Sequence, residues 1–396
     1  MMDLRGRVAV VGVGETELGR VPGKSSLALH AEAASAALRD AGIAKEEVDG
    51  VLTNDSYHDY HVRHAMAFAE YFGVSSSATT VTTMPLGSAA AGGLFLHEAA
   101  ALILSGRCRT VLAVSADNFL SALGRGGAVR ALAANRDKGF EAPYGPLLPA
   151  CFALVARRYM HETGTTSAQL AHVAVTMRAH ASRNPAAHMR QPITVDDVLA
   201  SPMIADPLHR LDCALVSDGG AALVVTSAER ARTLPKPPVY LLGAANCHGD
   251  GSGRLYSALA QSRDLTRTGT ARSAPEAMAQ AGVSHSDIDL VGCYDPFSVM
   301  PLVLLESAGF FARGTAGHAA AEGALRVGGQ LPVNPHGGLL SYCHPGNPGG
   351  MFMLTELVRQ LRHEAANQVP SAEVGVVLGY GGEFAIWPVT VLGNTP

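Results

Sequence analysis

Side chains that can donate or accept protons gather in one glycine- and proline-rich segment, residues 334–350, with the sequence NPHGGLLSYCHPGNPGG. It contains His336, Tyr342 and His344. Glycines allow a backbone to approach a ligand closely, and prolines restrict the loop around it. An apolar run with helical spacing follows directly, so we expect the polar cluster at a helix N-terminus, where developing negative charge is stabilised. The segment is therefore predicted to hold an anionic oxygen, with Asn334 and His336 as further contacts to the substrate.

A second candidate is Tyr294, which ends a strand-like apolar run and precedes an Asp-Pro pair. A phenol has a pKa near 10, so it needs a local partner to act as a base near neutral pH. A histidine such as His344 is a partner of that kind. Each of these residues could instead have a purely structural role: Tyr294 and His336 could be turn residues, and Tyr342 could be a packing residue.

A third group of candidate side chains is the sequence HDYHVRH, with His58, His61 and His64 at a spacing of three residues. This spacing could bring three imidazoles near one helix face and allow a metal ion. A solvated or interface helix is the interpretation that we prefer, and we expect no metal site.

Composition limits the classes of protein that can hold these residues. The chain has 396 residues, of which 47% are hydrophobic and 16% charged, which is typical of a compact protein with two domains or one large duplicated domain. Its net charge of −4 provides no basic surface for nucleic acid. No signal peptide and no bilayer-length apolar run are evident, and the six cysteines never form a CxxC pair. These features favour a cytoplasmic protein with reduced thiols.

The elements that must position the candidate residues are those of an α/β protein. Residues 7–12, RVAVVG, form a continuous apolar run typical of a buried strand. An alanine-rich helix is predicted over 25–41, closed by Gly42, and a strand follows over 48–52.

This opening pattern is repeated later in the chain. Residues 37–51 match residues 277–291 at a constant offset of 240 (281 − 41 and 289 − 49). The GGLF sequence at 92–95 also matches GGMF at 349–352, and the strand at 8–12 matches 239–243. Three matches in the same order indicate a duplicated α/β fold.

Domain boundaries follow from this repeat. The first half is predicted over 1–235, and it includes an inserted loop domain at about 117–211 with helices over 150–163 and 167–184. The second half is predicted over 236–396, after the proline-rich linker 234–238. Because the insertion occurs in one half only, we expect it to carry substrate specificity.

Taken together, the chain resembles the thiolase superfamily, in its sterol-carrier/lipid-transfer branch. The resemblance rests on the repeat, the SDGGAA sequence at 217–222, the NPHGG…HPG segment and the GYGG sequence at 379–382. It implies a duplicated five-layer α-β-α-β-α fold with an inserted loop domain. It also implies an acyl-CoA substrate, a homodimer formed through the first half, and a small OB-fold/zinc-ribbon protein as a possible partner.

The chain departs from the thiolase pattern at the nucleophile. The alignment puts Ala89 where thiolases have the reactive cysteine, and there is no cysteine between residues 84 and 106. The second thiolase cysteine is also missing, near Val376, and Cys343 lies elsewhere. His344 matches the retained histidine, Tyr294 stands in a segment that otherwise supplies an asparagine, and Gly381 matches the closing glycine motif that contacts substrate.

Two tyrosines and a histidine on a cysteine-less thiolase fold resemble the aldolases that cleave steroid side chains. The resemblance implies retro-aldol cleavage of a β-hydroxyacyl-CoA with a bulky, steroid- or lipid-like acyl group. Tyr294, Tyr342 and His344 would be catalytic, coenzyme A would enter only as part of the substrate, and no cofactor would be tightly bound. Two alternatives remain: an acyl-CoA C-acyltransferase, and a non-catalytic subunit of a complex with the OB-fold partner.

Overall fold

A computed structural model gives the fold of the chain. It describes residues 4–396 with the exception of residues 58, 60, 85–89, 134–138, 140–141, 146, 250–263 and 383. Within this part of the chain, nine strands form one sheet in the order β3-β2-β4-β7-β1-β8-β11-β10-β9. The strands of the first half are β1 (Val8–Glu15), β2 (Gly50–Thr53), β3 (Thr80–Thr83), β4 (Thr110–Asp117) and β7 (Gly219–Ser227). Those of the second half are β8 (Val239–His248), β9 (Leu290–Cys293), β10 (Val374–Leu378) and β11 (Ile386–Gly393).

The sheet contains the predicted duplication. The halves join where β1 pairs with β8 in antiparallel fashion, with Ala9 opposite Tyr240. From this junction the order β1-β7-β4-β2 in one direction matches β8-β11-β10-β9 in the other. The last two strands of each series are parallel to each other: β4 with β2 in the first half, and β10 with β9 in the second. The strands that correspond in space are those that the sequence repeat pairs.

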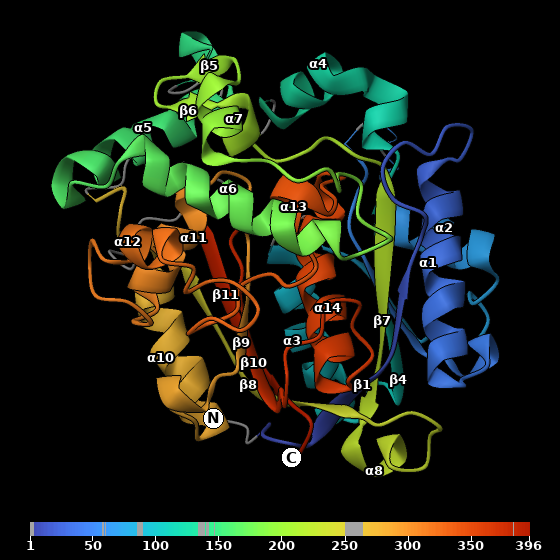
Figure 1. The fold of residues 1–396 in the computed structure, drawn as a ribbon. Helices are drawn as coiled ribbons and strands as arrows, with labels where there is room; N and C mark the ends of the chain where they lie inside the picture. The colour runs from blue at the N-terminus through green and yellow to red at the C-terminus, as the bar shows by residue number, and fades with distance from the viewer. Residues whose placement is uncertain are drawn as a thin grey trace.

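The helices complete five layers, which can be followed from side to side in Figure 1. Helices α1 (Ser26–Ala41) and α2 (His64–Phe72) cover the outer face of the strands of the first half, and α10 (Thr270–Ala281) covers the outer face of the strands of the second half. Helices α3 (Ala90–Leu104) and α14 (Met351–Leu361) lie between the strands of the first half and those of the second half. The predicted duplicated α-β-α-β-α fold is thus confirmed.

Close packing of helix on strand explains why the repeat is visible in the sequence. A Cβ atom added at Gly12 of β1 would lie 2.2 Å from the carbonyl oxygen of Ala37 in α1. At the equivalent Gly243 of β8 it would lie 2.0 Å from that of Ala277 in α10. Only glycine on the strand and a small residue on the helix allow this approach, so both halves keep the same residue types.

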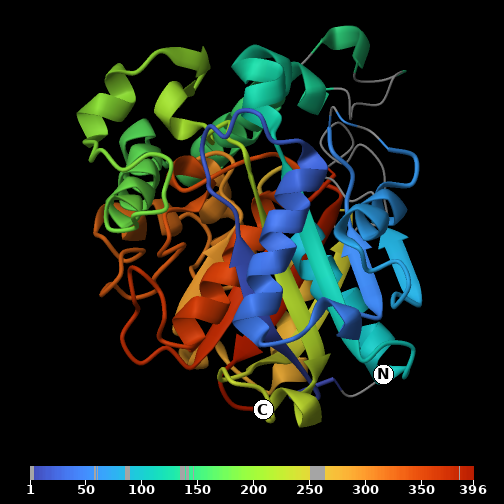
Figure 2. The ribbon, with the colours of Figure 1, turned by 90° about the vertical axis from the view of Figure 1, so that its right-hand side faces the viewer.

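The insertion between β4 and β7 lies at the top in Figure 1 and again in the side view of Figure 2. The predicted helices are present as α5 (Leu148–Thr163) and α6 (Ser167–Ser182). The other elements of this region are α4 (Phe119–Ala133), η2 (Ala142–Tyr144), α7 (Val195–Ala200), β5 (Met203–Ala205), β6 (Leu208–His209) and η3 (Arg210–Asp212). The limits of the insertion and the division at residue 235 stay predictions.

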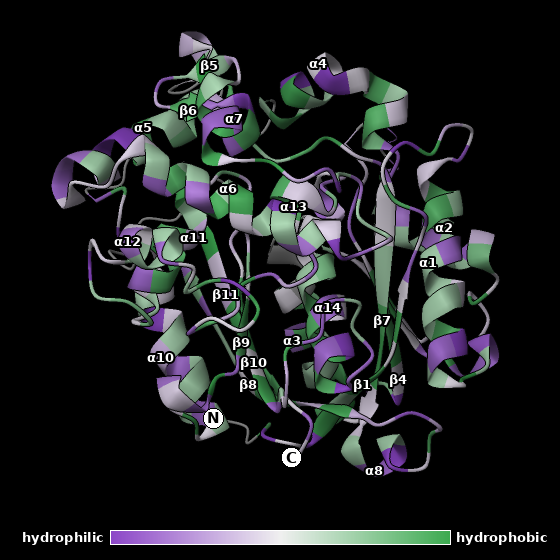
Figure 3. Cartoon of the chain, viewed as in Figure 1, coloured by the Kyte–Doolittle hydropathy of each residue, from purple (hydrophilic) through white to green (hydrophobic). Residues whose placement is uncertain are grey.

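The remaining short elements connect the layers, and they are η1 (Lys45–Glu47), α8 (Ala228–Ala231), η4 (His285–Asp287), α11 (Val299–Ser307), α12 (Ala316–Ala321), α13 (Gly338–Ser341) and η5 (Asn347–Gly350). Figure 3 shows hydrophobic or near-neutral colours along the central strands and hydrophilic colours on peripheral segments such as α8 and the outer end of α5.

Among the described helices, none has the length and apolar character that crossing a bilayer requires.

Candidate active site

Two of the predicted catalytic side chains meet in the structure. Tyr294 follows the last residue of β9, and its backbone N–H donates to the carbonyl oxygen of Leu378 in the neighbouring β10 (3.1 Å). Its hydroxyl lies 3.2 Å from Nε2 of His344. Both side chains are buried, with exposed fractions of 1% and 7%. The parallel pairing of β9 with β10 therefore brings Tyr294 to the histidine loop from 50 residues away.

The surroundings of His344 determine its protonation state. Nδ1 lies 3.1 Å from the carbonyl oxygen of Leu215, which can only accept, so Nδ1 carries the proton. The backbone N–H of His344 donates to Oγ of Ser217 (3.3 Å). Burial lowers the pKa of His344 to about 4, so the imidazole is neutral near pH 7. Nε2 consequently presents a lone pair that accepts from the Tyr294 hydroxyl.

The Tyr294–His344 pair is closely surrounded by aromatic and glycine residues. The rings of Tyr380 and Tyr294 pack in a T-shaped arrangement, with 5.0 Å between their centroids. A Cβ atom added at Gly349 would lie 3.2 Å from Cδ2 of His344 and 3.3 Å from Cε2 of Tyr294. In such surroundings an interaction between partial charges is stronger than in water.

Tyr342 makes different contacts, although it precedes His344 by only two residues. Its hydroxyl donates to Oε2 of Glu15 at the end of β1 (2.6 Å), and Arg359 of α14 pairs with the same carboxylate at 2.9 Å. Burial, followed by the charge of Glu15, raises the pKa of Tyr342 well above its usual value. The structure thus does not join the Tyr342 hydroxyl to the Tyr294–His344 pair.

His336 belongs to the same second cluster. Its ring meets that of Tyr342 at 4.9 Å, and neither of its ring nitrogens has a hydrogen-bond partner within the described part of the chain. Burial lowers its pKa to about 3. A neutral, buried histidine that packs on Tyr342 is what the structure shows at this position.

The other predicted substrate contacts are engaged within the protein. Both polar atoms of the Asn334 side chain bond to the backbone of Cys293. The backbone N–H of Gly381 donates to the carbonyl oxygen of Ile386 (2.8 Å). Ala89, predicted at the place of the missing nucleophile, lies outside the described residues.

Neither the cysteine near the pair nor the histidine cluster adds reactive chemistry. The Cys343 thiol is buried and donates to the carbonyl oxygen of Asp218 (3.6 Å), and burial raises its pKa far above the usual value. His58 lies outside the described residues, and His64 is buried against His30 with 3.4 Å between their Nε2 atoms. His64 therefore does not lie on a solvated face, and the alternative of an interface helix stays a prediction. Over the described part of the chain, no group of three or more acidic, histidine or cysteine side chains could hold a metal ion.

Three residues that bond to His344 or Tyr342 were not predicted from the sequence. Leu215 and Ser217 orient His344 through a carbonyl and a hydroxyl oxygen, and the sequence carries no signal for a contact made by a backbone carbonyl. Glu15 could have been found, because it is a carboxylate at the end of the otherwise apolar strand β1. Its side chain is buried and paired, which lowers its pKa despite the opposing effect of burial.

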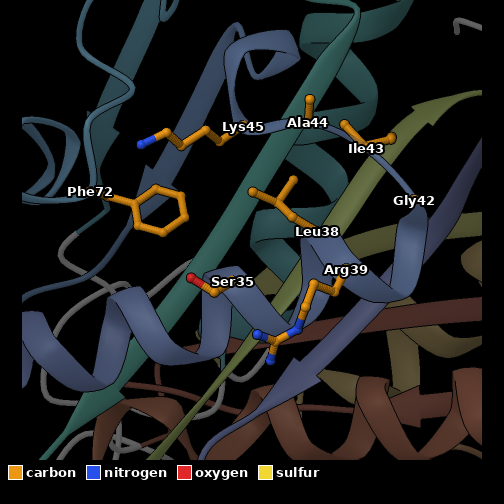
Figure 4. A pocket seen from close by; sticks show the side chains of 8 residues that line it. All are labelled: Ser35, Leu38, Arg39, Gly42, Ile43, Ala44, Lys45 and Phe72. Carbon is orange, nitrogen blue, oxygen red and sulfur yellow. The ribbon is translucent and has the colours of Figure 1, made fainter.

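A pocket elsewhere on the surface does not contain any predicted catalytic residue. It lies between α1 and α2 on the outer face of the first half, as Figure 4 shows. Its lining residues are Ser35, Leu38, Arg39, Gly42, Ile43, Ala44, Lys45 and Phe72. The predicted catalytic side chains that do meet, Tyr294 and His344, lie away from this pocket, in the buried interior.

The fold and the site together define a thiolase-type α/β protein with a buried tyrosine–histidine pair, Tyr294 and His344. Residues 8–229 match the family model "Thiolase, N-terminal domain", and residues 251–394 match "Thiolase C-terminal domain-like". The chain belongs to the thiolase superfamily, in its lipid-transfer branch.

Similar proteins refine this placement. The chain is 38% identical to the steroid side-chain-cleaving aldolase of Thermomonospora curvata, over 93% of each chain. It is 34% identical to an acetyl-CoA acetyltransferase of Methanothermobacter thermautotrophicus, over 95% of this chain and 96% of that one. The solved structure "Ltp2-ChsH2(DUF35) aldolase" superposes with a TM-score of 0.86 at 35% identity, over 98% of each chain. These findings confirm the predicted class of enzyme, a carbon–carbon lyase, and show that acetyltransferases are also related.

Proposed function

We propose that this protein cleaves a β-hydroxyacyl-CoA thioester by a retro-aldol reaction, and that Tyr294 and His344 transfer the protons. The observation that carries the proposal is the 3.2 Å contact between the Tyr294 hydroxyl and the unprotonated Nε2 of a neutral His344. The name of the similar steroid side-chain-cleaving aldolase supports a bulky, steroid- or lipid-like acyl group.

The proposed proton path uses both members of the pair. The substrate hydroxyl gives its proton to the Tyr294 oxygen while Tyr294 gives its own proton to Nε2 of His344. The O–H electron pair then forms the new C=O bond, and the electrons of the broken Cα–Cβ bond form a thioester enolate. The proton returns from His344 through Tyr294 to Cα. The products are a ketone or aldehyde and a shorter acyl-CoA, with no net gain or loss of protons.

This path lets a phenol accept a proton without first becoming a phenolate, at the cost of forming an imidazolium that burial disfavours. A free tyrosine has a pKa of about 10, so it is almost wholly protonated near neutral pH. A histidine that accepts the tyrosine proton during the reaction removes the need for a preformed phenolate. The Leu215 carbonyl stabilises the imidazolium that results, because it already accepts a hydrogen bond from Nδ1 at 3.1 Å.

The test is turnover of a β-hydroxyacyl-CoA by the purified protein, with and without a DUF35-type partner. We expect a carbonyl product and a shorter acyl-CoA in equal amounts. Removal of one proton-transfer group typically costs about 10²–10⁴-fold in rate, so Tyr294→Phe should lower kcat by at least about 10²-fold. Absence of product under both conditions, or unchanged turnover by Tyr294→Phe, would contradict the proposal.

An acyltransferase is the second candidate, favoured by the similarity to acetyl-CoA acetyltransferase. It would need a nucleophile that forms an acyl-enzyme, and burial raises the pKa of the Cys213 thiol to about 12 and that of the Cys293 thiol well above its usual value. Intact-mass measurement after treatment with acyl-CoA distinguishes the two candidates. An added acyl group would favour the transferase, whereas the aldolase passes through no covalent intermediate.

We also propose that the active form is a homodimer that binds a small OB-fold partner. The similar aldolase structure is named for a DUF35 component together with the aldolase, which supports the second association. If the chain is instead a non-catalytic subunit, the complex will turn over substrate with Tyr294→Phe as fast as without the substitution.

A further inference from the structure

Asn334 makes contacts that set it apart from a substrate-binding residue. Its Oδ1 accepts from the backbone N–H of Cys293 (2.7 Å), and its Nδ2 donates to the carbonyl oxygen of the same residue (2.6 Å). Cys293 directly precedes Tyr294. The amide side chain therefore bonds to the end of β9 as a neighbouring strand would, one residue before the proposed catalytic phenol.

The segment that carries Tyr294 is held on its other side as well. The oxygens of the Asp295 carboxyl group, whose pKa burial raises to about 8, accept from the backbone N–H groups of Leu339 (2.8 Å) and Leu340 (3.5 Å), at the beginning of α13. A Cβ atom at Gly338 would lie 2.1 Å from Oδ2 of Asp295, so only glycine allows this approach. The segment from Asn334 to α13 thus binds both neighbours of Tyr294, and His344 lies three residues beyond α13.

Asn334 is itself held in place firmly. It has a φ of 48°, a left-handed conformation that asparagine tolerates better than most residues. Its backbone N–H donates to the carbonyl oxygen of Val291 (2.9 Å), and its carbonyl oxygen accepts from Nδ1 of His180 (3.1 Å). Nε2 of His180 in turn accepts from the backbone N–H of Val327 (3.1 Å). The Asn334 side chain also makes a hydrogen bond to the Asp295 side chain. With these bonds and no exposed surface, Asn334 has no free group for an oxyanion.

We propose that Asn334 is a positioning residue that sets the distance between Tyr294 and His344 by fixing the end of β9 against the histidine loop. This inference rests on the proposed function of the pair. The contact of 3.2 Å leaves little room for displacement before the hydrogen bond is lost. An error of about 1 Å in the position of a catalytic group can cost about 10²-fold in rate.

Two substitutions of Asn334 separate the effect of losing the side-chain amide from the effect of straining the backbone. Asn334→Gly removes the side-chain bonds to Cys293 and Asp295 and tolerates the positive φ, whereas Asn334→Ala removes the same bonds and adds strain. The matched control is Asn367→Ala. Nδ2 of Asn367 donates to the carbonyl oxygen of Pro335, the next residue of the same loop, at 3.0 Å, and its side chain is also buried. The control therefore removes a comparable bond that does not reach Cys293.

The kinetic expectation is a loss in kcat without a change in KM. Asn334→Gly should lower kcat by about 10²-fold, because the pair is displaced while substrate contacts remain. Asn367→Ala should leave kcat close to that of the unsubstituted protein. A rise in KM with unchanged kcat for Asn334→Gly would show a substrate contact and overturn the proposal.

A second readout does not depend on activity. The ¹⁵N chemical shift of Nε2 of His344 reports the Tyr294 hydrogen bond in the ligand-free protein, and it is assigned by comparison with His344→Gln. We expect Asn334→Gly to move this shift toward that of Tyr294→Phe, and Asn367→Ala to leave it in place. An unchanged shift in Asn334→Gly overturns the positioning role. A moved shift with unchanged turnover supports that role and overturns instead the proposed function of the pair.

Discussion

At the scale of single residues, two tyrosines of equal chemical type differ in the group that accepts their proton. Tyr294 donates to a neutral imidazole that can take the proton and become charged. Tyr342 donates to the Glu15 carboxylate, which already pairs with Arg359. Loss of the Tyr342 proton would place two negative charges side by side, so this phenol is a poor base.

Tyr342→Phe tests this difference. The substitution removes a hydrogen bond to a charged group, so it should destabilise the protein by about 1.5–3 kcal/mol. We expect kcat to stay within about twofold of the unsubstituted protein, because no contact to a reacting atom is lost and a twofold change corresponds to only about 0.4 kcal/mol of activation free energy. Urea unfolding and turnover measured on the same preparation provide both numbers. A fall in kcat as large as that of Tyr294→Phe would restore Tyr342 as a catalytic residue.

At the scale of elements, the parts that sequence reasoning found are those fixed by local residue pattern. The strand at residues 8–12, the alanine-rich helix and their copies in the second half repeat their glycine and alanine positions, because helix and strand touch there. The meeting of Tyr294 with His344 is expected only from family resemblance. In the structure it depends on the pairing of β9 with β10 and on the bonds of Asn334 to Cys293, which join residues far apart in the chain.

Gly12→Ala and Gly243→Ala test the equivalence of the two halves. Each added methyl group would overlap a helix carbonyl, at Ala37 or at Ala277, and overpacking of this kind costs about 1–3 kcal/mol or more. We expect similar losses of unfolding free energy for both variants, measured by urea denaturation.

The matched control for these two variants is Gly126→Ala in α4. A Cβ atom there would meet only the Nη1 atom of Arg130, at 3.6 Å, so the substitution should be neutral or stabilising by up to about 1 kcal/mol. If Gly243→Ala is as harmless as this control while Gly12→Ala is not, then the packing of the two halves is not equivalent.

At the scale of the whole molecule, the two ends of the sheet are β3 and β9. The edge strand β3 is half-buried along its length, and the nearby α2 begins at His64. Large apolar side chains are exposed on and beside α2, with exposed fractions of 84% for Val62 and 51% for Met66. An open strand edge next to exposed apolar side chains is a surface that commonly pairs with another chain. We therefore expect the proposed homodimer contact on this side of the first half.

Met66→Glu tests this contact, because a carboxylate buried at a dimer interface without a partner is strongly unfavourable. We expect sedimentation velocity to show a dimer for the unsubstituted protein and a monomer for the variant, at the same concentration and with unchanged circular dichroism. Tyr144→Glu is the matched control, since Tyr144 is also apolar and exposed (85%) but lies in the insertion. Its variant should remain dimeric. A dimer that survives Met66→Glu and dissociates with Tyr144→Glu would move the interface to the insertion, over the face where we expect substrate specificity to reside.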